Sequence, residues 1–457
     1  MKRTVVIVLG LMMSAGIATF VLAQKLLPPA AQAAALDPTQ ATLATHFLDL
    51  LDAARYDKAL SMGTPTLRAG LADGKLQQAW ETLPAQLGKR ESRGPLRGET
   101  INGESVVSSR LAFAMMSLDA RVVFNSQNSI SGFWIVPAVD IQQKAMANPQ
   151  HIARERDLTI GEDSVPLPAT LTLPKGNPPF VAVVLVHGSG PHDRDETIGL
   201  NKPFLDIANG LAERGIAVLR YEKRTMARPD LFAHGSFSVD DETVNDALAA
   251  VAALRGQSDI DPAQIYVIGH SLGAMMAPRI GQRDKDIAGL ILLAAPASRL
   301  EDIVVRQTRY LAKLQGKSDA DIDSMLAAIE PQRQAVKHLD ANSPDRVPLL
   351  LGLPASYWLD LNSYDPIQTA RSIDQPIMLL QGGRDYQVSA ADEFSLWRSA
   401  FATNPRFEMI EYPLLGHAFM PGNDPPGPKD YEKPAHVDDK VLDDIAHWIN
   451  GNRVHAS

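Results

Sequence analysis

The 457-residue chain contains no cysteine. It therefore forms no disulfide, offers no thiolate to a zinc ion, and carries no lipid-modified N-terminal cysteine. The sequence also lacks a His-Glu-x-x-His string or comparable spacing, which argues against a zinc-dependent reaction. We expect neither a metal nor a cofactor. The formal net charge is −9, and this negative balance argues against nucleic acid or an anionic membrane surface as the main partner.

The N-terminal segment has the pattern of a secretory signal. It reads MKRTVVIVLGLMMSAGIATFVLAQ, two basic residues followed by an apolar stretch and a small-residue end at Val21 and Ala23. This pattern predicts a signal peptide over residues 1–23, cleaved after Ala23. Removal of Lys2 and Arg3 leaves 42 of the 44 basic residues against 53 acidic ones, a mature charge of −11. We expect an exported protein, periplasmic or secreted, with an uncleaved membrane anchor as the alternative because the stretch is about as long as a membrane span.

The next part of the chain predicts a small α+β domain over residues 37–150. Residues 24–36 are rich in Pro and Ala and predict a linker. Apolar residues at helical spacing predict amphipathic helices to about residue 88. Residues 104–113 and 118–137 alternate in polarity around the polar turn NSQNS, as antiparallel strands do. No cluster of His, Asp and Glu suggests catalysis here, so we interpret the domain as an accessory or binding module.

Residues 151–457 predict a larger α/β domain. Buried apolar strands alternate with helices, which is typical of a mainly parallel sheet covered on both faces. About 65 residues rich in helix formers interrupt the alternation, and we interpret this insertion, about residues 298–365, as a helical cap. The strands are predicted at 180–188, 216–222, 265–269, 289–296, 376–385 and 407–413, and the helices outside the cap at 202–214, 240–256, 390–402 and 436–450, with another directly after Ser271.

The string IYVIGHSLGAM places Ser271 between a predicted strand and a predicted helix. A Gly-x-Ser-x-Gly match alone decides little, but a strand before it and a helix after it are typical of a nucleophile elbow. In that turn the serine is strained and its hydroxyl is exposed. Gly269 and Gly273 then have a steric reason, because a Cβ at either position would crowd the turn.

A serine nucleophile needs a base within hydrogen-bond reach and a carboxylate that orients the base. In this type of fold the acid and then the histidine follow the serine in chain order. Asp385 lies just past the first strand after the cap, and His417 follows the last strand in the loop LLGHAF. These residues and Ser271 all fall at the carboxyl ends of predicted strands, so we predict a Ser271, Asp385 and His417 triad.

Other acids and histidines compete for these roles. Asp365 and Asp392 are the alternative acids. His436 and His447 are the alternative bases, although both fit the face of the final predicted helix.

Acyl transfer also needs N–H donors for an oxyanion. One is predicted to be the backbone N–H of Leu272, at the start of the elbow helix. The other should come from the string HGSGP, and we predict the N–H of Ser189, with Gly190 as the alternative. His187 precedes the nucleophile, and we interpret it as a structural histidine that bonds the loop.

With these strings in place, residues 154–450 resemble a bacterial α/β-hydrolase of the serine esterase type. The segment from HGSGPHDRDE to RYEKR is similar to exported esterases that carry a small domain before the hydrolase. The resemblance implies an α/β-hydrolase fold with a helical cap and hydrolysis of a small-molecule carboxylic ester through an acyl-enzyme, without a cofactor. HDRDE (192–196) and RYEKR (220–224) belong to the resemblance but suggest no catalytic role, and we interpret them as structural ion-pair loops.

Several alternatives use the same residues. A peptidase, a thioesterase or a lactone hydrolase would need the same triad, although export argues against acyl-CoA substrates. A binding protein with a degenerate hydrolase domain is a further alternative, against which the complete triad argues. Within the cap, Tyr357 and Trp358 are either walls of a substrate pocket or simply cap core.

Overall fold

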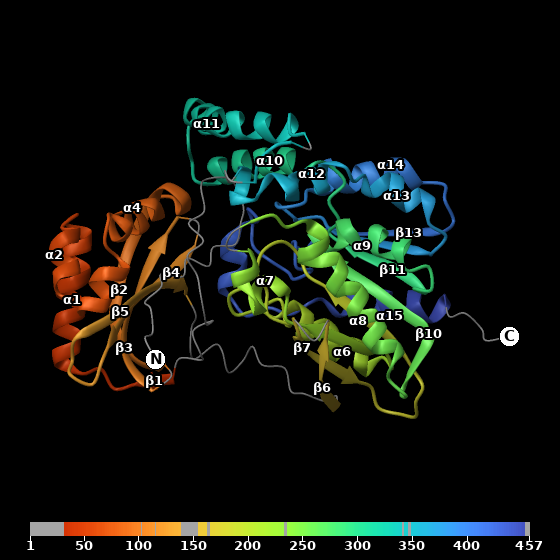
Figure 1. Cartoon of the computed structure of the whole chain (residues 1–457), viewed down its shortest axis with the longest axis horizontal. Coiled ribbons are helices and arrows are strands. Elements are labelled where there is room, and N and C mark those ends of the chain that lie inside the picture. Colours follow the sequence, from red (N-terminus) through yellow and green to blue (C-terminus); the bar gives the residue numbers. More distant parts are fainter. Residues whose placement is uncertain are drawn as a thin grey trace. The chain divides into compact units, whose positions relative to one another are not determined.

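The computed structural model describes residues 32–101, 103–114, 116–138, 154–161, 165–232, 235–340, 342–345 and 349–452. The predicted signal peptide, residues 1–23, and the first part of the predicted linker lie outside these residues. Within the described part of the chain, no helix is both long enough and apolar enough to cross a membrane. The chain divides into two compact units (Figure 1).

The first unit is an antiparallel sheet covered by helices. Its five strands lie in the order β1-β2-β3-β4-β5. Apolar residues of α1 and α4, such as Phe47 and Trp80, pack against Phe133 of β5. The predicted helices and the strands at 104–113 and 118–137 are confirmed. The elements are β1 (Gln32–Ala34), α1 (Pro38–Asp52), α2 (Tyr56–Ser61), α3 (Pro65–Gly70), α4 (Lys75–Leu87), β2 (Arg90–Ile101), β3 (Glu104–Phe113), β4 (Ser117–Phe124) and β5 (Ile130–Pro137).

The predicted linker over residues 24–36 is wrong at its end, where residues 32–34 form the edge strand β1. This strand pairs with β2 through backbone groups, and Ala34 lies opposite Gly98. A Cβ built on Gly98 would lie 2.7 Å from the carbonyl oxygen of Ala34. Because an edge strand is held by its backbone, a short alanine-rich segment can form one without a distinctive side-chain pattern.

The second unit is built on an eight-stranded sheet with the order β13-β12-β11-β10-β8-β9-β7-β6. The pairs from β13 to β9 are all parallel, whereas β7 is antiparallel to both β9 and β6. The sheet is therefore mainly parallel, as predicted. Its strands are β6 (Arg154–Ile160), β7 (Leu167–Leu173), β8 (Phe180–Val186), β9 (Ala217–Tyr221), β10 (Ile260–His270), β11 (Gly289–Leu293), β12 (Ile377–Gly382) and β13 (Phe407–Tyr412).

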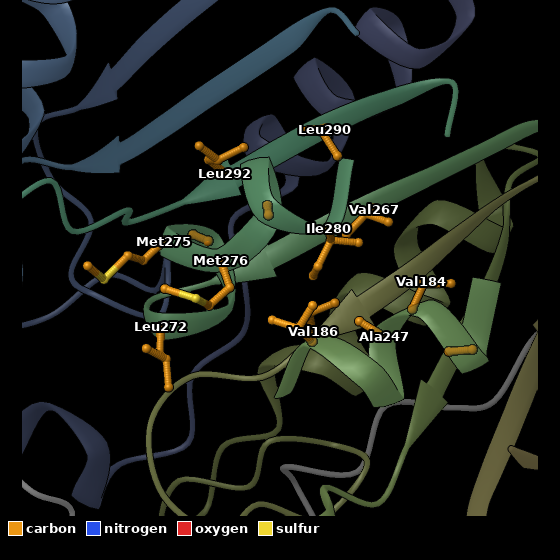
Figure 2. Packing of buried hydrophobic residues seen from close by; sticks show 14 of the residues in the cluster. Val184, Val186, Ala247, Val267, Leu272, Met275, Met276, Ile280, Leu290 and Leu292 are labelled. Atoms are coloured by element: carbon orange, nitrogen blue, oxygen red, sulfur yellow. The ribbon is translucent and has the colours of Figure 1, made fainter. Parts of the chain in front are cut away.

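Helices cover both faces of this sheet. Val267 of β10 packs in the cluster with Ala247 of α8 and Ile280 of α9 (Figure 2). The preceding residue, Tyr266, points to the other face, because side chains alternate along a strand, and its ring meets Trp448 of α15 edge-on. The helices of this framework are α6 (Pro203–Glu213), α7 (Arg224–Ala227), α8 (Asn245–Arg255), α9 (Leu272–Arg283), α13 (Pro366–Ser372), α14 (Ser395–Phe401) and α15 (Asp439–Gly451), with short 3-10 or π turns η1 (Pro229–Phe232), η2 (Asp240–Val244), η4 (Ala390–Phe394) and η5 (Pro428–Glu432).

The predicted cap is helical and lies between β11 and β12 in the order of the chain. Figure 1 shows its helices α10, α11 and α12. Its elements are α10 (Leu300–Leu314), α11 (Asp319–Lys337), η3 (Leu350–Gly352) and α12 (Ala355–Asn362). Tyr357 and Trp358 belong to the buried core and are 2% and 0% exposed. The Trp358 indole donates a hydrogen bond to the Leu350 carbonyl at 3.2 Å. Both side chains therefore pack in the buried core, which the cap shares with the sheet.

Candidate active site

Ser271 occupies a strained turn between β10 and α9. Its backbone has φ 53° and ψ −115°, a region that residues other than glycine rarely adopt. Its N–H donates to the Leu293 carbonyl of the neighbouring strand at 2.9 Å. A Cβ on Gly269 would lie 2.2 Å from the Gly273 carbonyl oxygen, and one on Gly273 would lie 2.2 Å from the Val186 carbonyl oxygen. The steric reason predicted for both glycines is confirmed, and the turn has the strand-to-helix geometry of a nucleophile elbow.

Asp385 and His417 lie in direct contact. Nδ1 of His417 is 2.7 Å from Oδ2 of Asp385, and both residues are buried. The other carboxylate oxygen of Asp385 accepts backbone N–H bonds from Gln387 at 2.8 Å and Val388 at 2.9 Å. These bonds fix the carboxylate, and the carboxylate in turn fixes the imidazole, which leaves Nε2 as the ring nitrogen free to act on a substrate or a hydroxyl.

The histidine loop is also joined to the elbow. His270 directly precedes Ser271, and its Nε2 is 3.0 Å from the backbone carbonyl oxygen of His417. The two imidazole rings have centroids 4.6 Å apart. The structure therefore brings His417 and Asp385 together beside the elbow that carries Ser271.

The competing acids and histidines are engaged elsewhere. Asp365 caps α13 by accepting from the Gln368 N–H, and Asp392 lies 4.0 Å from Arg306. His447 is exposed on α15. The expectation that His436 also lies on this helix is wrong, because α15 begins at Asp439. The His436 ring instead meets Asp206 at 3.0 Å.

The HGSGP loop runs beside the elbow. A Cβ built on Gly188 would lie 3.2 Å from the Cβ of Ser271, so the loop backbone directly faces the serine. The N–H of Gly188 is already used, since it donates to Oε1 of Glu196 at 2.7 Å. Among the described residues, no group accepts a hydrogen bond from the backbone N–H of Ser189 or of Leu272. Both predicted donors are therefore available, and Leu272 lies in the first turn of α9, where the helix dipole favours negative charge.

His187 is buried and structural, as predicted. Its Nε2 lies 3.0 Å from the Asp193 carbonyl oxygen, and its ring packs against Phe204 and Tyr221. Burial lowers the pKa of His187 to about 3, because the charged imidazolium is poorly solvated inside the protein. His187 is therefore neutral at ordinary pH, and its contacts give it a structural role in the loop and not the role of the catalytic base.

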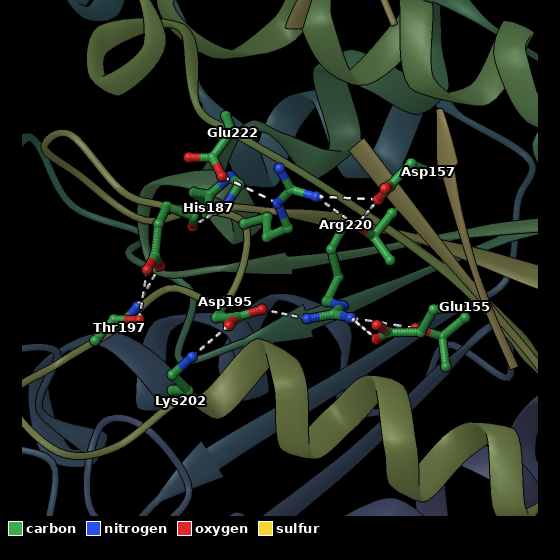
Figure 3. Close-up of polar contacts among 12 residues, drawn as sticks. Glu155, Asp157, His187, Asp195, Thr197, Lys202, Arg220 and Glu222 are labelled. Carbon is green, nitrogen blue, oxygen red and sulfur yellow. Dashed lines mark hydrogen bonds and ion pairs between the residues drawn. The ribbon is translucent and has the colours of Figure 1, made fainter. Parts of the chain in front are cut away.

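The strings HDRDE and RYEKR form ion pairs with each other, also as predicted. Arg220 pairs with Asp195 and Glu155 (Figure 3). Arg194 pairs with Glu222. These pairs connect the loop after β8 with β9 and with the edge strand β6. The loop that follows the HGSGP string is thus anchored to the sheet by ion pairs.

Three buried residues of this region were not predicted as part of the site: Glu196, Lys223 and His270. Oε2 of Glu196 lies 2.9 Å from Nδ1 of His270. Burial acts to raise the pKa of Glu196, but the charge and hydrogen bond of His270 outweigh it and lower the pKa to about 2. Burial acts to lower the pKa of His270, and Glu196 outweighs it and raises that pKa. The two side chains therefore favour each other's charged form, at the residue that directly precedes Ser271.

Within the part of the chain that the structure describes, no group of three or more His, Asp or Glu side chains is arranged to hold a metal ion. The arrangement around Ser271 offers a strained serine, an oriented imidazole and two unused backbone N–H groups, which are the elements of acyl transfer.

Comparison with known proteins identifies the family. Residues 183–428 match the family described as "Alpha/beta hydrolase family". The esterase EstD of Thermotoga maritima is 35% identical over 407 residues, which cover 88% of this chain and 93% of that relative. The chain therefore belongs to the α/β-hydrolase family. Residues 44–133 match a second family, described as a protein of unknown function (DUF3887).

Two solved structures share low similarity with the chain. Est1E from Butyrivibrio proteoclasticus is 18% identical, with a TM-score of 0.43, over 65% of this chain and 98% of that one. An esterase from Pyrococcus furiosus is 19% identical, with a TM-score of 0.40, over 58% of this chain and 84% of that one. The family assignment rests on the family match and on the Thermotoga relative.

Proposed function

We propose that this protein is a carboxylic-ester hydrolase that acts through an acyl-enzyme on Ser271. The observation that carries the proposal is the contact of His417 with Asp385, at 2.7 Å, on loops that follow β13 and β12. The elbow serine follows β10 in the same sheet, so all three residues lie at carboxyl ends of parallel strands, where sites form in this fold. Membership of the α/β-hydrolase family and the relative named as an esterase support the same reaction.

The reaction has two steps. Nε2 of His417 takes the proton of the Ser271 hydroxyl as its oxygen attacks the ester carbonyl. Asp385 stabilises the imidazolium, and the alcohol leaves with that proton. Water then attacks the acyl-enzyme by the same route, and the carboxylic acid leaves.

Each tetrahedral intermediate places a negative charge on the former carbonyl oxygen. The backbone N–H groups of Leu272 and Ser189 stabilise this charge by donating hydrogen bonds to the oxygen. Each donor of this kind typically contributes a factor of about 100 to 1,000 in kcat. Gly190 is the alternative to Ser189 as the loop donor.

The natural substrate is a small-molecule ester. A peptide, a thioester or a lactone would use the same triad, and a panel of esters of graded acyl length with matched thioester, lactone and peptide compounds separates these classes. Preference for one acyl length would come from the cap, since the cap is inserted between β11 and β12 on the side of the sheet where the site lies.

We also propose that the protein is exported. The support is the pattern of residues 1–23, in which two basic residues precede an apolar stretch and a small-residue end. Cell fractionation with a mass measurement of the native N-terminus tests this. A chain that begins at Gln24 outside the cytoplasm is the expected result, and a full-length chain in the membrane would support the anchored alternative.

Replacement of the nucleophile tests the catalytic proposal. Ser271→Ala should remain folded and lose on the order of a thousandfold or more in kcat. Ser324→Ala is the control, because Ser324 is exposed on α11 and its hydroxyl only bonds the Ala320 carbonyl. A serine-directed organophosphonate should label Ser271 in the unmodified enzyme, as mapped by peptide mass. Activity of Ser271→Ala near the level of the control, or a label on another serine, would refute the assignment.

A further inference from the structure

The peptide groups on both sides of Gly188 are held by buried charged side chains. Oε1 of Glu196 accepts the Gly188 N–H, and Nζ of Lys223 donates to the Gly188 carbonyl oxygen, each at 2.7 Å. Glu196 and Lys223 are 1% and 2% exposed. Glycine has unusual backbone freedom, so these two contacts fix a segment that would otherwise be adaptable.

The contact from Lys223 determines where the next N–H points. The Gly188 carbonyl and the Ser189 N–H belong to one planar trans peptide, in which the two bonds point in opposite directions. A cation that binds the carbonyl oxygen therefore directs the Ser189 N–H to the side of the loop away from Lys223. It also draws electron density from the peptide, which makes that N–H a stronger donor.

We propose that Lys223 is a positioning residue for the oxyanion hole, which orients and polarises the Gly188–Ser189 peptide so that the Ser189 N–H stabilises the tetrahedral intermediate. This inference rests on the function proposed above and extends it to a residue that does not contact the substrate. Lys223 acts through the peptide alone, since its ammonium lies on the carbonyl side.

The surroundings of Lys223 explain how an ammonium is kept at a buried position. Nζ also donates to Oε1 of Glu242 at 2.7 Å, and Oε2 of Glu242 accepts the Tyr357 hydroxyl at 2.6 Å. Burying an isolated charge is costly, whereas a hydrogen-bonded pair is tolerated. Glu242 therefore holds the ammonium in place, and Tyr357 links this pair to α12 of the cap.

A structural role is the competing explanation, because loss of a buried ion pair destabilises many proteins. The neighbouring residue offers a matched control. Arg224 belongs to the same string and pairs with the buried Asp246 instead of with Glu242. If Lys223 were only structural, its loss and the loss of Arg224 would affect all substrates alike.

The test compares an aryl ester with the matching thionoester, in which sulfur replaces the carbonyl oxygen. Sulfur is a weak hydrogen-bond acceptor, so the thionoester gains little from the Ser189 N–H. Lys223→Met should lower kcat for the ester by about 10-fold to 100-fold with little change in KM, less than the loss of a whole donor. The thionoester rate should fall far less, so the ester-to-thionoester ratio should drop by about tenfold. Arg224→Met should leave that ratio at the wild-type value.

A second variant guards against misfolding. Lys223→Met leaves Glu242 buried without its cation, so Lys223→Met is also made together with Glu242→Gln, which removes both charges. Either variant can be used for the test if it is folded. The ester-to-thionoester rate ratio is expected to drop in both. A fall in rate that is equal for ester and thionoester in a folded variant would overturn the positioning role.

The two proposals fail in different ways. If Ser271→Ala keeps its activity, the acyl-enzyme assignment falls and the positioning role falls with it. If Ser271 proves to be the nucleophile and the ratio in the Lys223 variants equals the wild-type ratio, the inference about Lys223 alone is wrong.

Discussion

Replacement of Gly273 by alanine tests whether the elbow depends on close backbone approach. Gly273 is helical, and alanine is normally favoured over glycine in a helix by about 1 kcal/mol. Here the added Cβ would lie 2.2 Å from the Val186 carbonyl oxygen and 2.7 Å from that of His187. Both atoms belong to backbone at the end of β8, which cannot rotate away as a side chain would.

The size of the effect follows from the required movement. The first contact would have to open by about 1.2 Å, the difference between 2.2 Å and the 3.4 Å at which ordinary contact begins. Overpacking of this kind typically costs about 1–3 kcal/mol, which exceeds the gain in helix propensity. The movement also separates α9 from the HGSGP loop, and a misplacement of about 1 Å can cost about 100-fold in rate. We expect Gly273→Ala to lower both the free energy of unfolding and kcat/KM by these amounts.

Urea unfolding and hydrolysis of a short-chain nitrophenyl ester measure the two effects. Gly256→Ala is the control, because Gly256 ends α8 with φ −79° and its nearest contact would be at 3.5 Å. That change should be neutral or stabilising by up to about 1 kcal/mol. If Gly273→Ala behaved like Gly256→Ala in both assays, the close approach at the elbow would have no energetic importance and the argument would be wrong.

Three further predictions concern the acid, a buried histidine and the division of the chain. Asp385→Asn should lower kcat by about 10,000-fold with little change in unfolding, because the imidazole loses its orienting partner; greater damage from Asp365→Asn or Asp392→Asn would move the acid elsewhere. Burial lowers the pKa of His187 from 6.5 to about 3. As the pH falls below 6.5, the imidazole therefore gains a proton in the unfolded chain but not in the folded protein. The folded protein loses stability relative to the unfolded chain below that pH, whereas above it His187 adds no pH dependence. The free energy of unfolding should drop by about 2 kcal/mol more in the wild type than in His187→Gln between pH 6.5 and 4.5, and equal slopes in urea titrations would contradict this. A chain truncated to begin at residue 153 keeps the whole buried cluster from Ile160 to Phe401, so it should fold and cleave a short ester, whereas a folded but inactive product would mean that the first unit completes the site.

The parallel part of the sheet was predictable because its strands are buried on both faces. Residues 180–186 form one continuous apolar run, and all seven are buried in β8. Strands β6, at the edge of the second sheet, and β2, inside the first, were not predicted. β6 reads RERDLTI and is mostly exposed, and β2 contains Gly94 and Pro95 at a register shift from Arg93 to Leu96. A strand with a solvent-exposed face, or with interrupted hydrogen-bond pairing, lacks the continuous apolar run that is typical of a strand buried on both faces.

The candidate triad was predictable because its geometry follows from the order of the chain. Ser271, Asp385 and His417 each come within a few residues of a strand end, and the ends of parallel strands meet at one edge of a sheet. Asp385 and His417 can therefore be predicted to lie close together even though they are 32 positions apart in the sequence.

The residues that hold the site in place follow no such rule. Glu196 reaches His270, and Lys223 reaches Gly188, from loops whose course the strand pattern does not determine. Their strings could be recognised as charged, but a charged string is compatible with solvated loops as well as with buried pairs. Only burial distinguishes the two, and burial depends on packing among several segments.

This difference between the reacting groups and their supports has a physical origin. A nucleophile and its base need particular residue types at fixed positions of the fold, because the chemistry has few solutions. A carbonyl can be held by any donor that reaches it, so the supporting residue can come from many places in the chain. The hydrogen bond of Lys223 to Gly188 at 2.7 Å is one such solution. Its importance follows from the peptide that it holds, since the other end of that peptide is the N–H of Ser189, directly beside the residue that faces Ser271.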